Sequence, residues 1–127
     1  MNRLKGKIAL ITGAARGIGE AIAQAFLNEG ASVYLSDISD ELGNSTAKRL
    51  GSLAKYVRLD VRKEQDWASV TKAIIDAHDA IDVVVNNAGI TGFEYGDLVH
   101  DPENASLEAW RTVHQTNLDG VFLGCKY

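Results

Sequence analysis

A glycine-rich stretch near the N-terminus has the residue types and spacing needed to bind a phosphate. It runs from Thr12 to Gly19 (TGAARGIG, spaced G-x-x-x-G-x-G), between a β-branched run and a helical apolar period. Glycines let backbone amides approach a phosphate closely, and a helix N-terminus adds free N–H groups and a partial positive charge. A tight turn is the alternative, but the expected strand before the glycines and the expected helix after them favour a dinucleotide site. Its expected contacts are Gly13, Arg16, Gly17, Ile18 and Gly19.

Asp37 stands at the end of the next β-branched run, where its carboxylate could accept hydrogen bonds from a ribose. The same charge would repel a 2′-phosphate, and the following residue, Ile38, supplies no cation to neutralise one. We therefore predict NAD rather than NADP as the cofactor, although Arg16 could reach a phosphate and argues for NADP. The alternative role for Asp37 is in a turn or a helix cap, for which Asp40 is better placed.

Four short β-branched runs must position these side chains, and a stretch with helical periodicity follows each of them. Nearly continuous apolar runs predict strands that are buried on both faces of a parallel sheet. Because strands and helices alternate with short connections, we expect an α/β fold with a Rossmann-like, doubly wound parallel sheet of about four strands. The strands are expected at Lys7–Thr12, Ser32–Ser36, Lys55–Leu59 and Asp82–Asn86.

Helical apolar periods fill the segments between and after the strands. The last helix is expected to begin with Ser106 as its N-cap and to carry Asn117 on an apolar stripe, where a buried amide must be hydrogen-bonded. The stripe consists of Trp110, Val113, Asn117 and Val121. The preceding loop, Ile90–Ala105, is expected to lack regular structure, and long loops are often functional. The other helices are expected from Ile18 to near Gly30, at Asp40–Leu50 and within Lys63–His78.

Composition and charge restrict the class of protein. The chain has 127 residues, of which 46% are hydrophobic and 24% charged, and its formal net charge is −4. These values fit one globular domain, 1–127, and exclude a disordered chain. We expect no nucleic-acid or membrane partner, because charges are scattered and apolar runs are short. No signal peptide is visible and Cys125 has no cysteine partner, so we expect a cytoplasmic protein. A metal site is not expected, since His100 has too few neighbouring ligands.

Taken in order, five motifs resemble the short-chain dehydrogenase/reductase family. They are the glycine stretch, Asp37, Leu59-Asp60-Val61, Asn86-Asn87-Ala88-Gly89, and Asn117 within Thr116–Phe122. The resemblance, with background similarity to bacterial hydroxysteroid and cyclic-alcohol dehydrogenases, implies an oxidoreductase that transfers a hydride between NAD and a small-molecule secondary alcohol or ketone. We also expect a homo-oligomer.

The resemblance implies a role for each later motif. It implies that Asp60 contacts the adenine by its side chain and Val61 by its main chain, whereas the residues alone leave a helix-capping role open for Asp60. The segment Asn87, Ala88 and Gly89 would lie along the nicotinamide ribose, with Asn86 tying neighbouring strands together; an ordinary turn is the alternative. Asn117 is the family's catalytic position, where the residue perturbs its helix and its main chain holds a water in a proton relay.

The tyrosine and lysine of the family, spaced Tyr-x-x-x-Lys, do not occur in these residues: no lysine stands four positions after Tyr34, Tyr56, Tyr95 or Tyr127. We therefore expect the N-terminal half of a family member, truncated within its last helix and inactive as a dehydrogenase when isolated. The fourth strand would then form an exposed sheet edge that favours self-association. The alternative is a non-catalytic nucleotide-binding or regulatory module that ends naturally at residue 127.

Overall fold

A computed structural model describes residues 2–96 and 99–127. Within these residues, four parallel strands form a sheet in the order β3-β2-β1-β4. The strands are β1 (Ile8–Thr12), β2 (Ser32–Asp37), β3 (Ala54–Arg58) and β4 (Val83–Val85). The predicted α/β, Rossmann-like parallel sheet is therefore confirmed, with strand ends within one residue of those expected.

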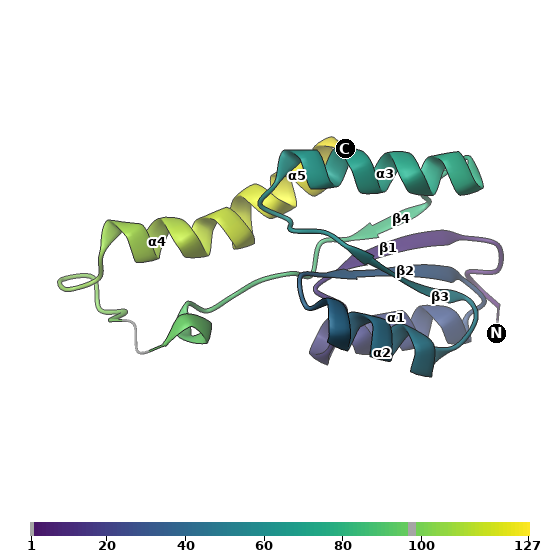
Figure 1. Cartoon of the computed structure of the whole chain (residues 1–127), viewed down its shortest axis with the longest axis horizontal. Coiled ribbons are helices and arrows are strands. Elements are labelled where there is room, and N and C mark those ends of the chain that lie inside the picture. The colour runs from purple at the N-terminus through teal and green to yellow at the C-terminus, as the bar shows by residue number, and fades with distance from the viewer. Residues whose placement is uncertain (1, 97–98) are drawn as a thin grey trace.

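Helices cover both faces of the sheet (Figure 1). α1 (Gly17–Asn28) and α2 (Asp40–Leu50) lie on one face, and α3 (Glu64–His78) and α5 (Gly120–Lys126) lie on the other. α4 (Leu107–His114) extends away from the sheet, beyond the end at which the strands finish. Among the described residues, no helix is long and apolar enough to cross a bilayer.

The two central strands explain why the sheet needs helices on both faces. Ile8 and Leu10 of β1 pack in the core cluster that contains Trp67 of α3, whereas Ala9 and Ile11 pack in the cluster on the α1 side. Successive side chains of a strand point to opposite faces, so a continuous apolar run fills two cores at once. The predicted burial on both faces is correct for β1 and β2.

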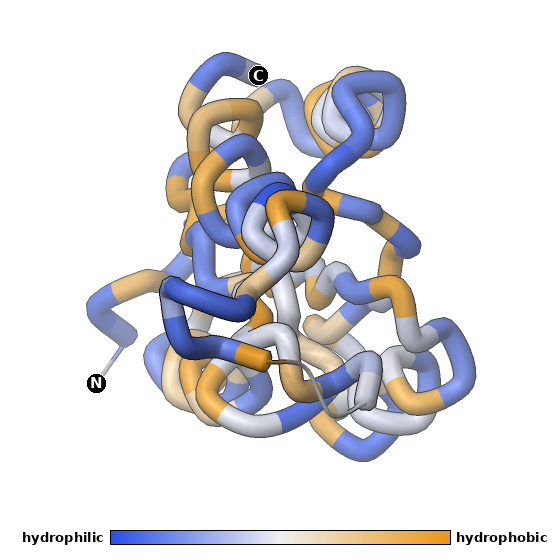
Figure 2. Tube along the Cα trace, turned by 90° about the vertical axis from the view of Figure 1, so that its left-hand side faces the viewer, coloured by the Kyte–Doolittle hydropathy of each residue, from blue (hydrophilic) through white to orange (hydrophobic). Residues whose placement is uncertain are grey.

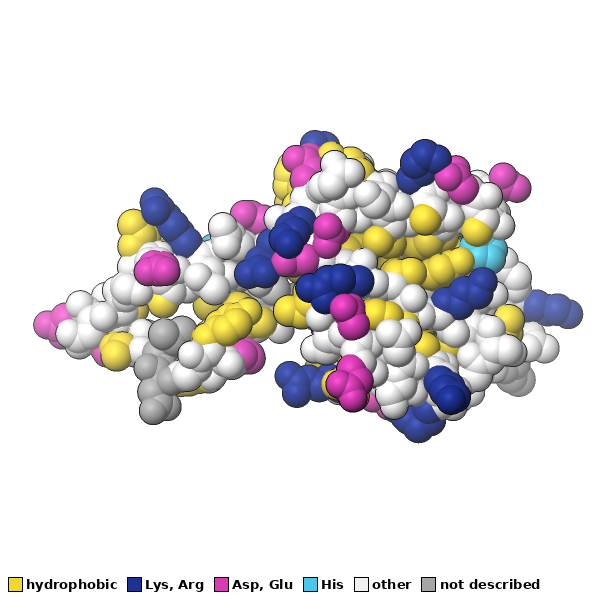
Figure 3. Space-filling model, viewed as in Figure 1, with side chains coloured by type: hydrophobic (Ala, Val, Ile, Leu, Met, Phe, Trp, Pro, Cys, Tyr) yellow, Lys and Arg dark blue, Asp and Glu magenta, His cyan; other side chains and the backbone are white. Residues whose placement is uncertain are grey.

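The same prediction is wrong for β3 and β4, which are only partly buried because each has a sheet neighbour on one side. Figure 3 shows where the β3 edge reaches the surface: hydrophobic side chains gather in a band between the two helical layers. Figure 2, which views the molecule from its α4 side, shows hydrophilic stretches in most of the outer turns. Large exposed hydrophobic side chains also lie outside the sheet, among them Ile18 of α1, Trp110 of α4 and Phe122 of α5.

Two short helices depart from the elements that regular periodicity predicts. A 3₁₀ helix, η1 (Phe93–Tyr95), lies in the loop that was predicted to be irregular, and a π-helix, η2 (Gln115–Asp119), joins α4 to α5. The N-cap prediction is confirmed, because the Ser106 Oγ accepts a hydrogen bond from the backbone N–H of Ala109 at 3.0 Å.

The apolar stripe predicted for this last helix is wrong. Trp110 is 61% exposed and Asn117 is also exposed, whereas Thr116, Gly120 and Leu123 are buried. Trp110 is exposed because α4 extends away from the sheet, and after α4 the wider turns of the π-helix rotate the following residues relative to an uninterrupted α-helix. The face that packs on α3 is therefore shifted from the one that regular periodicity selects.

Candidate functional site

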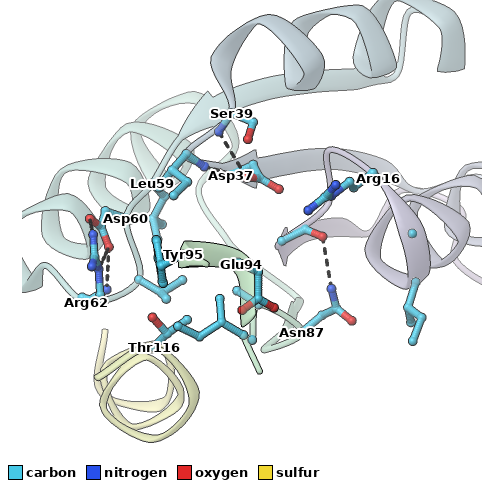
Figure 4. A pocket seen from close by; sticks show the side chains of 18 residues that line it. Arg16, Asp37, Ser39, Leu59, Asp60, Arg62, Asn87, Glu94, Tyr95 and Thr116 are labelled. Carbon is cyan, nitrogen blue, oxygen red and sulfur yellow. Dashed lines mark hydrogen bonds and ion pairs between the residues drawn. The ribbon is translucent and has the colours of Figure 1, made fainter. Parts of the chain in front are cut away.

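A cavity of about 440 Å³ opens where the four strands end, at the carboxyl edge of the sheet (Figure 4). This edge is where open α/β sheets bind ligands, and the volume suits a small-molecule site. The structure brings nearly all of the predicted cofactor contacts into its lining: Gly13, Arg16, Gly17, Ile18, Asp37, Asp60, Val61, Asn87, Ala88 and Gly89. Gly19 is buried behind this lining.

The glycine stretch leaves the start of α1 open to the cavity. Gly17 has φ +62°, and a Cβ built on it would meet no atom within 4 Å, so this backbone faces open space. Gly13, at φ +63°, lies so close to the next strand end that its Cβ would stand 2.8 Å from the Ala88 Cα. No side chain caps α1 at Arg16, so its first-turn amides are available to an anion.

Asp37 fixes the turn after β2 to the glycine stretch. Its Oδ1 accepts hydrogen bonds from the N–H groups of Ile38 (2.8 Å) and Ser39 (3.2 Å), and its Oδ2 accepts one from the Ala15 N–H (3.2 Å). These three backbone donors orient the carboxylate at the cavity wall. An Asp held in this way keeps acceptor capacity on Oδ2, since a carboxylate has about four acceptor sites.

Asn87 ties the end of β4 to the end of β1. Its Nδ2 donates to the Thr12 and Gly13 carbonyls at 3.0 and 3.2 Å, and its own N–H donates to the Thr12 Oγ1 at 3.0 Å. The prediction that Asn86 performs this task is wrong. Asn86 instead points toward α5, where its Nδ2 lies 3.8 Å from the Cys125 Sγ, because successive residues of a strand face opposite sides.

Asp60 lines the cavity just after the end of β3, and hydrogen bonds from Arg62 fix its carboxylate. The Arg62 Nε and backbone N–H donate to Asp60 Oδ1 at 2.9 and 3.1 Å, and the Arg62 Nη2 donates to Oδ2 at 2.7 Å. The hydrogen bonds from the Arg62 side chain are the main cause that lowers the pKa of the Asp60 carboxyl. The helix-capping alternative is not observed, because Lys63 is the N-cap of α3.

Asn117 lies in the π-helix and binds the backbone that follows β4. Its Oδ1 accepts from the Ile90 N–H at 2.7 Å, and its Nδ2 donates to the Ile90 carbonyl at 2.8 Å. The side-chain amide of Asn117 therefore makes the two hydrogen bonds to the Ile90 backbone that a neighbouring strand would otherwise make. Although the side chain is exposed rather than buried as predicted, both of its polar groups are paired.

Sequence reasoning missed several residues of the cavity wall. The largest surprise is η1, which brings Glu94 and Tyr95 into the cavity (Figure 4). The Glu94 carboxylate accepts from the N–H groups of Thr91 (2.9 Å) and Gly92 (2.8 Å), and the Thr91 N–H is the main cause that lowers the pKa of Glu94 to about 2. No sequence pattern predicts this turn. The other missed residues are Ile38, Ser39, Leu59, Arg62, Ile90 and Thr116.

The loop that carries η1 also contains His100, whose ring packs at a tilt of 40° against the Phe93 ring with centroids 3.9 Å apart. Within residues 2–96 and 99–127, no three His, Cys, Asp or Glu side chains are grouped so that they could hold a metal ion.

Comparisons with known proteins agree with this geometry. A family model described as short chain dehydrogenase matches residues 7–127. The chain is 42% identical over 127 residues to a zerumbone synthase from Zingiber zerumbet, covering 98% of this chain and 46% of the relative. It is 40% identical over 125 residues to a 3-beta-hydroxysteroid dehydrogenase from Comamonas testosteroni, covering 98% of this chain and 47% of that protein. The chain thus spans less than half the length of the curated relatives it matches.

Among solved structures, the chain is similar to a 3-ketoacyl-(acyl-carrier-protein) reductase from Brucella melitensis in complex with NADH. The TM-score is 0.86 at 33% sequence identity, and the match covers 97% of this chain and 48% of the reductase.

Proposed function

Because this chain belongs to the short chain dehydrogenase family, we propose that residues 1–127 form one NAD-binding domain of an oxidoreductase acting on a secondary alcohol or ketone. The observation that supports this most is the convergence of four strand ends on one cavity, with an open helix N-terminus and two fixed carboxylates in its wall. Relatives named as a borneol dehydrogenase and a 3-beta-hydroxysteroid dehydrogenase support the alcohol or ketone as substrate class.

The residues present fit a dinucleotide. The open space at Gly17 suits a pyrophosphate, which the first amides of α1 would bind together with the positive end of the helix dipole. Asp37 would accept hydrogen bonds from the adenosine ribose, and Asp60 and Val61 would receive the adenine. Asn87, Ala88 and Gly89 would lie along the nicotinamide ribose. The bound nicotinamide would accept or donate the hydride.

The choice of NAD over NADP rests on Asp37. Its two carboxylate oxygens already accept from three backbone N–H groups, so the negative charge is fixed at the cavity wall. A 2′-phosphate placed there would meet this charge at close range. Arg16, which also lines the cavity, is the one nearby cation of the glycine stretch and the residue that favours NADP.

Asn117 is proposed as the catalytic position through its main chain. The amide side chain is already paired with both polar groups of Ile90, so it holds the segment after Gly89 in place. The π-helix at this residue departs from the regular α-helical pattern. We assign the Asn117 carbonyl, rather than its side chain, to holding the water of a proton relay.

We propose that this chain binds NAD but does not catalyse hydride transfer. None of its four tyrosines is followed by a lysine four residues later, so the proton-transfer pair of the family is missing. The 127-residue chain should bind NAD without oxidising an alcohol. The alternative is a non-catalytic nucleotide-binding or regulatory module.

The test is calorimetric titration of the purified chain with NAD and NADP, followed by a search for NADH formation from borneol and from a 3-beta-hydroxysteroid. Saturable binding that is tighter for NAD, without turnover, is expected. Turnover by a chain of confirmed mass would overturn the predicted inactivity. The gene sequence after codon 127 separates the two functions, because an in-frame Tyr-x-x-x-Lys supports the enzyme and a stop codon supports the module.

We further propose that the chain forms a homo-oligomer. The outer edge of β4 has no strand beside it among the described residues, and Val84 in this strand is 37% exposed. Unpaired edges of this kind bind other strands. Light scattering should show a mass above that of a monomer, and a monodisperse monomer at high concentration would contradict the proposal.

A further inference from the structure

Tyr95 places an aromatic ring in the cavity wall. Its loop follows β4, which lies at the opposite edge of the sheet from β3. The ring belongs to η1, lines the cavity and remains 58% exposed. Ile38, which lines the cavity from the end of β2, is 47% exposed. Exposed apolar side chains inside a cavity indicate a surface that a flat apolar group could cover.

The ring lies at the Asp60 end of the cavity. Figure 4 shows Tyr95 beside Leu59 on the side of Asp60 and Arg62, whereas Arg16 and Asn87 lie on the opposite side. Tyr95 is also one of the groups that raise the pKa of Arg62, after the dominant hydrogen bonds to Asp60. The η1 loop therefore reaches across the cavity, away from the strand that it follows.

The polar groups at this end restrict what could lie against the ring. The Asp60 side chain is only 7% exposed, and Arg62 takes three of its acceptor positions. A carboxylate has about four such positions, so one remains for a donor. A planar base with an exocyclic amine supplies both an apolar face and that donor.

Local hydrogen bonds fix η1 without any ligand. The Glu94 carboxylate accepts from Thr91 and Gly92 N–H groups and from the Thr91 Oγ1, which closes the turn before Tyr95. Gly92 and Gly96, at φ +98° and +115°, allow the chain to enter and leave this turn. The backbone of Tyr95 is thus held before a ligand arrives, which lowers the entropy cost of binding.

Resting on the proposed NAD site, we infer that the Tyr95 ring forms the outer wall of the adenine pocket and packs against the base that Asp60 receives. The loop after β4 then contributes to the adenosine half of the cofactor site. An aromatic ring against a base contributes enough that its removal weakens binding about ten-fold.

The test compares three variants by calorimetry with NAD and with ADP-ribose, which lacks the nicotinamide. Tyr95→Ala should weaken both ligands by the same factor, about ten-fold, and Tyr95→Phe should bind both like the original chain. Phe93→Ala is the matched control, because Phe93 is an equally exposed ring of the same short helix (62%) that does not line the cavity. It should leave both affinities unchanged.

The contrary outcomes are distinct. A loss seen with NAD but absent with ADP-ribose would place Tyr95 at the nicotinamide and overturn the inference. Equal losses in Tyr95→Ala and Phe93→Ala would show that only the fold of the loop matters, which also overturns it. Unchanged binding by Tyr95→Ala would refute the Tyr95 contact while leaving NAD binding intact, whereas no binding by the original chain would refute both.

Discussion

Gly17 and Gly19 stand two residues apart in the same turn, yet the structure predicts different main consequences for replacing each by alanine. At Gly17 an added Cβ meets no atom within 4 Å, and the strain comes from φ +62° alone. At Gly19 the Cβ would stand 2.3 Å from the Gly13 carbonyl oxygen and 2.8 Å from the Ala14 Cα, both of which are backbone atoms. One substitution therefore acts on the cavity and the other on the fold.

The magnitudes follow from these distances. The left-handed backbone conformation costs an alanine about 1–2 kcal/mol. Alanine also lowers the conformational entropy of the unfolded chain, which offsets about half of that cost. Gly17→Ala should therefore lower the free energy of unfolding by about 1 kcal/mol. At Gly19 a contact of 2.3 Å must open by about 1 Å to become ordinary. Overpacking of this kind costs about 1–3 kcal/mol or more. The Gly17 methyl group, in contrast, occupies the space proposed for the pyrophosphate and should weaken NAD by at least about ten-fold.

The assay is urea unfolding by circular dichroism together with calorimetric titration with NAD. Gly6→Ala is the matched control, because Gly6 also has a left-handed backbone (φ +77°) with no atom within 4 Å of its Cβ, but it does not line the cavity. Gly6→Ala should match Gly17→Ala in stability and the original chain in NAD affinity. Normal NAD binding by Gly17→Ala, or a Gly19→Ala variant as stable as the original chain, would contradict these expectations.

Three further predictions concern other residues. Asp37→Asn should weaken NAD by about 1–3 kcal/mol and improve NADP relative to NAD, because the fixed charge is lost; calorimetry showing an unchanged ratio would exclude Asp37 from discrimination. Trp67→Phe should lower the unfolding free energy by about 1–3 kcal/mol, since the buried indole N–H donates to the Val61 carbonyl at 2.9 Å; urea unfolding measures this, and an unchanged midpoint would contradict it. The pKa of Asp60 is lowered in the folded chain, so its contribution to stability should be complete above the unfolded pKa of about 3.9 and lost as pH falls through the folded pKa. In Arg62→Met, carboxyl NMR should show the Asp60 pKa moving up toward the ordinary value, and an unmoved titration would contradict the ion pair as its cause.

The parallel sheet was predictable because its information is local. Continuous β-branched runs identified β1 and β2, and the glycines after β1 identified the loop that opens α1. Asp37 ends β2 and Asp60 follows β3, so parallel topology alone brings them to the same edge. These features depend on residue type, period and connection length.

The other features depend on packing that spacing does not encode. The π-helix at Asn117 shifted the buried face of the last helix, and a regular period cannot anticipate an added residue per turn. Asn87 ties the strand ends together in place of Asn86, because a one-residue change of register reverses the side of the sheet that a residue faces. Tyr95 lines the cavity because the Glu94 carboxylate closes the turn before it, and no sequence motif predicts that turn.

The central claim is that the carboxyl edge of this sheet binds NAD. The most direct measurement is a titration of the isotope-labelled chain with NAD, followed by amide NMR shifts. Saturable shifts are expected that are largest along the cavity, at Gly13, Gly17, Ile38, Val61 and Ala88, with little change at the far end of the sheet around Gly30. Absent shifts, or shifts centred elsewhere on the molecule, would contradict the claim.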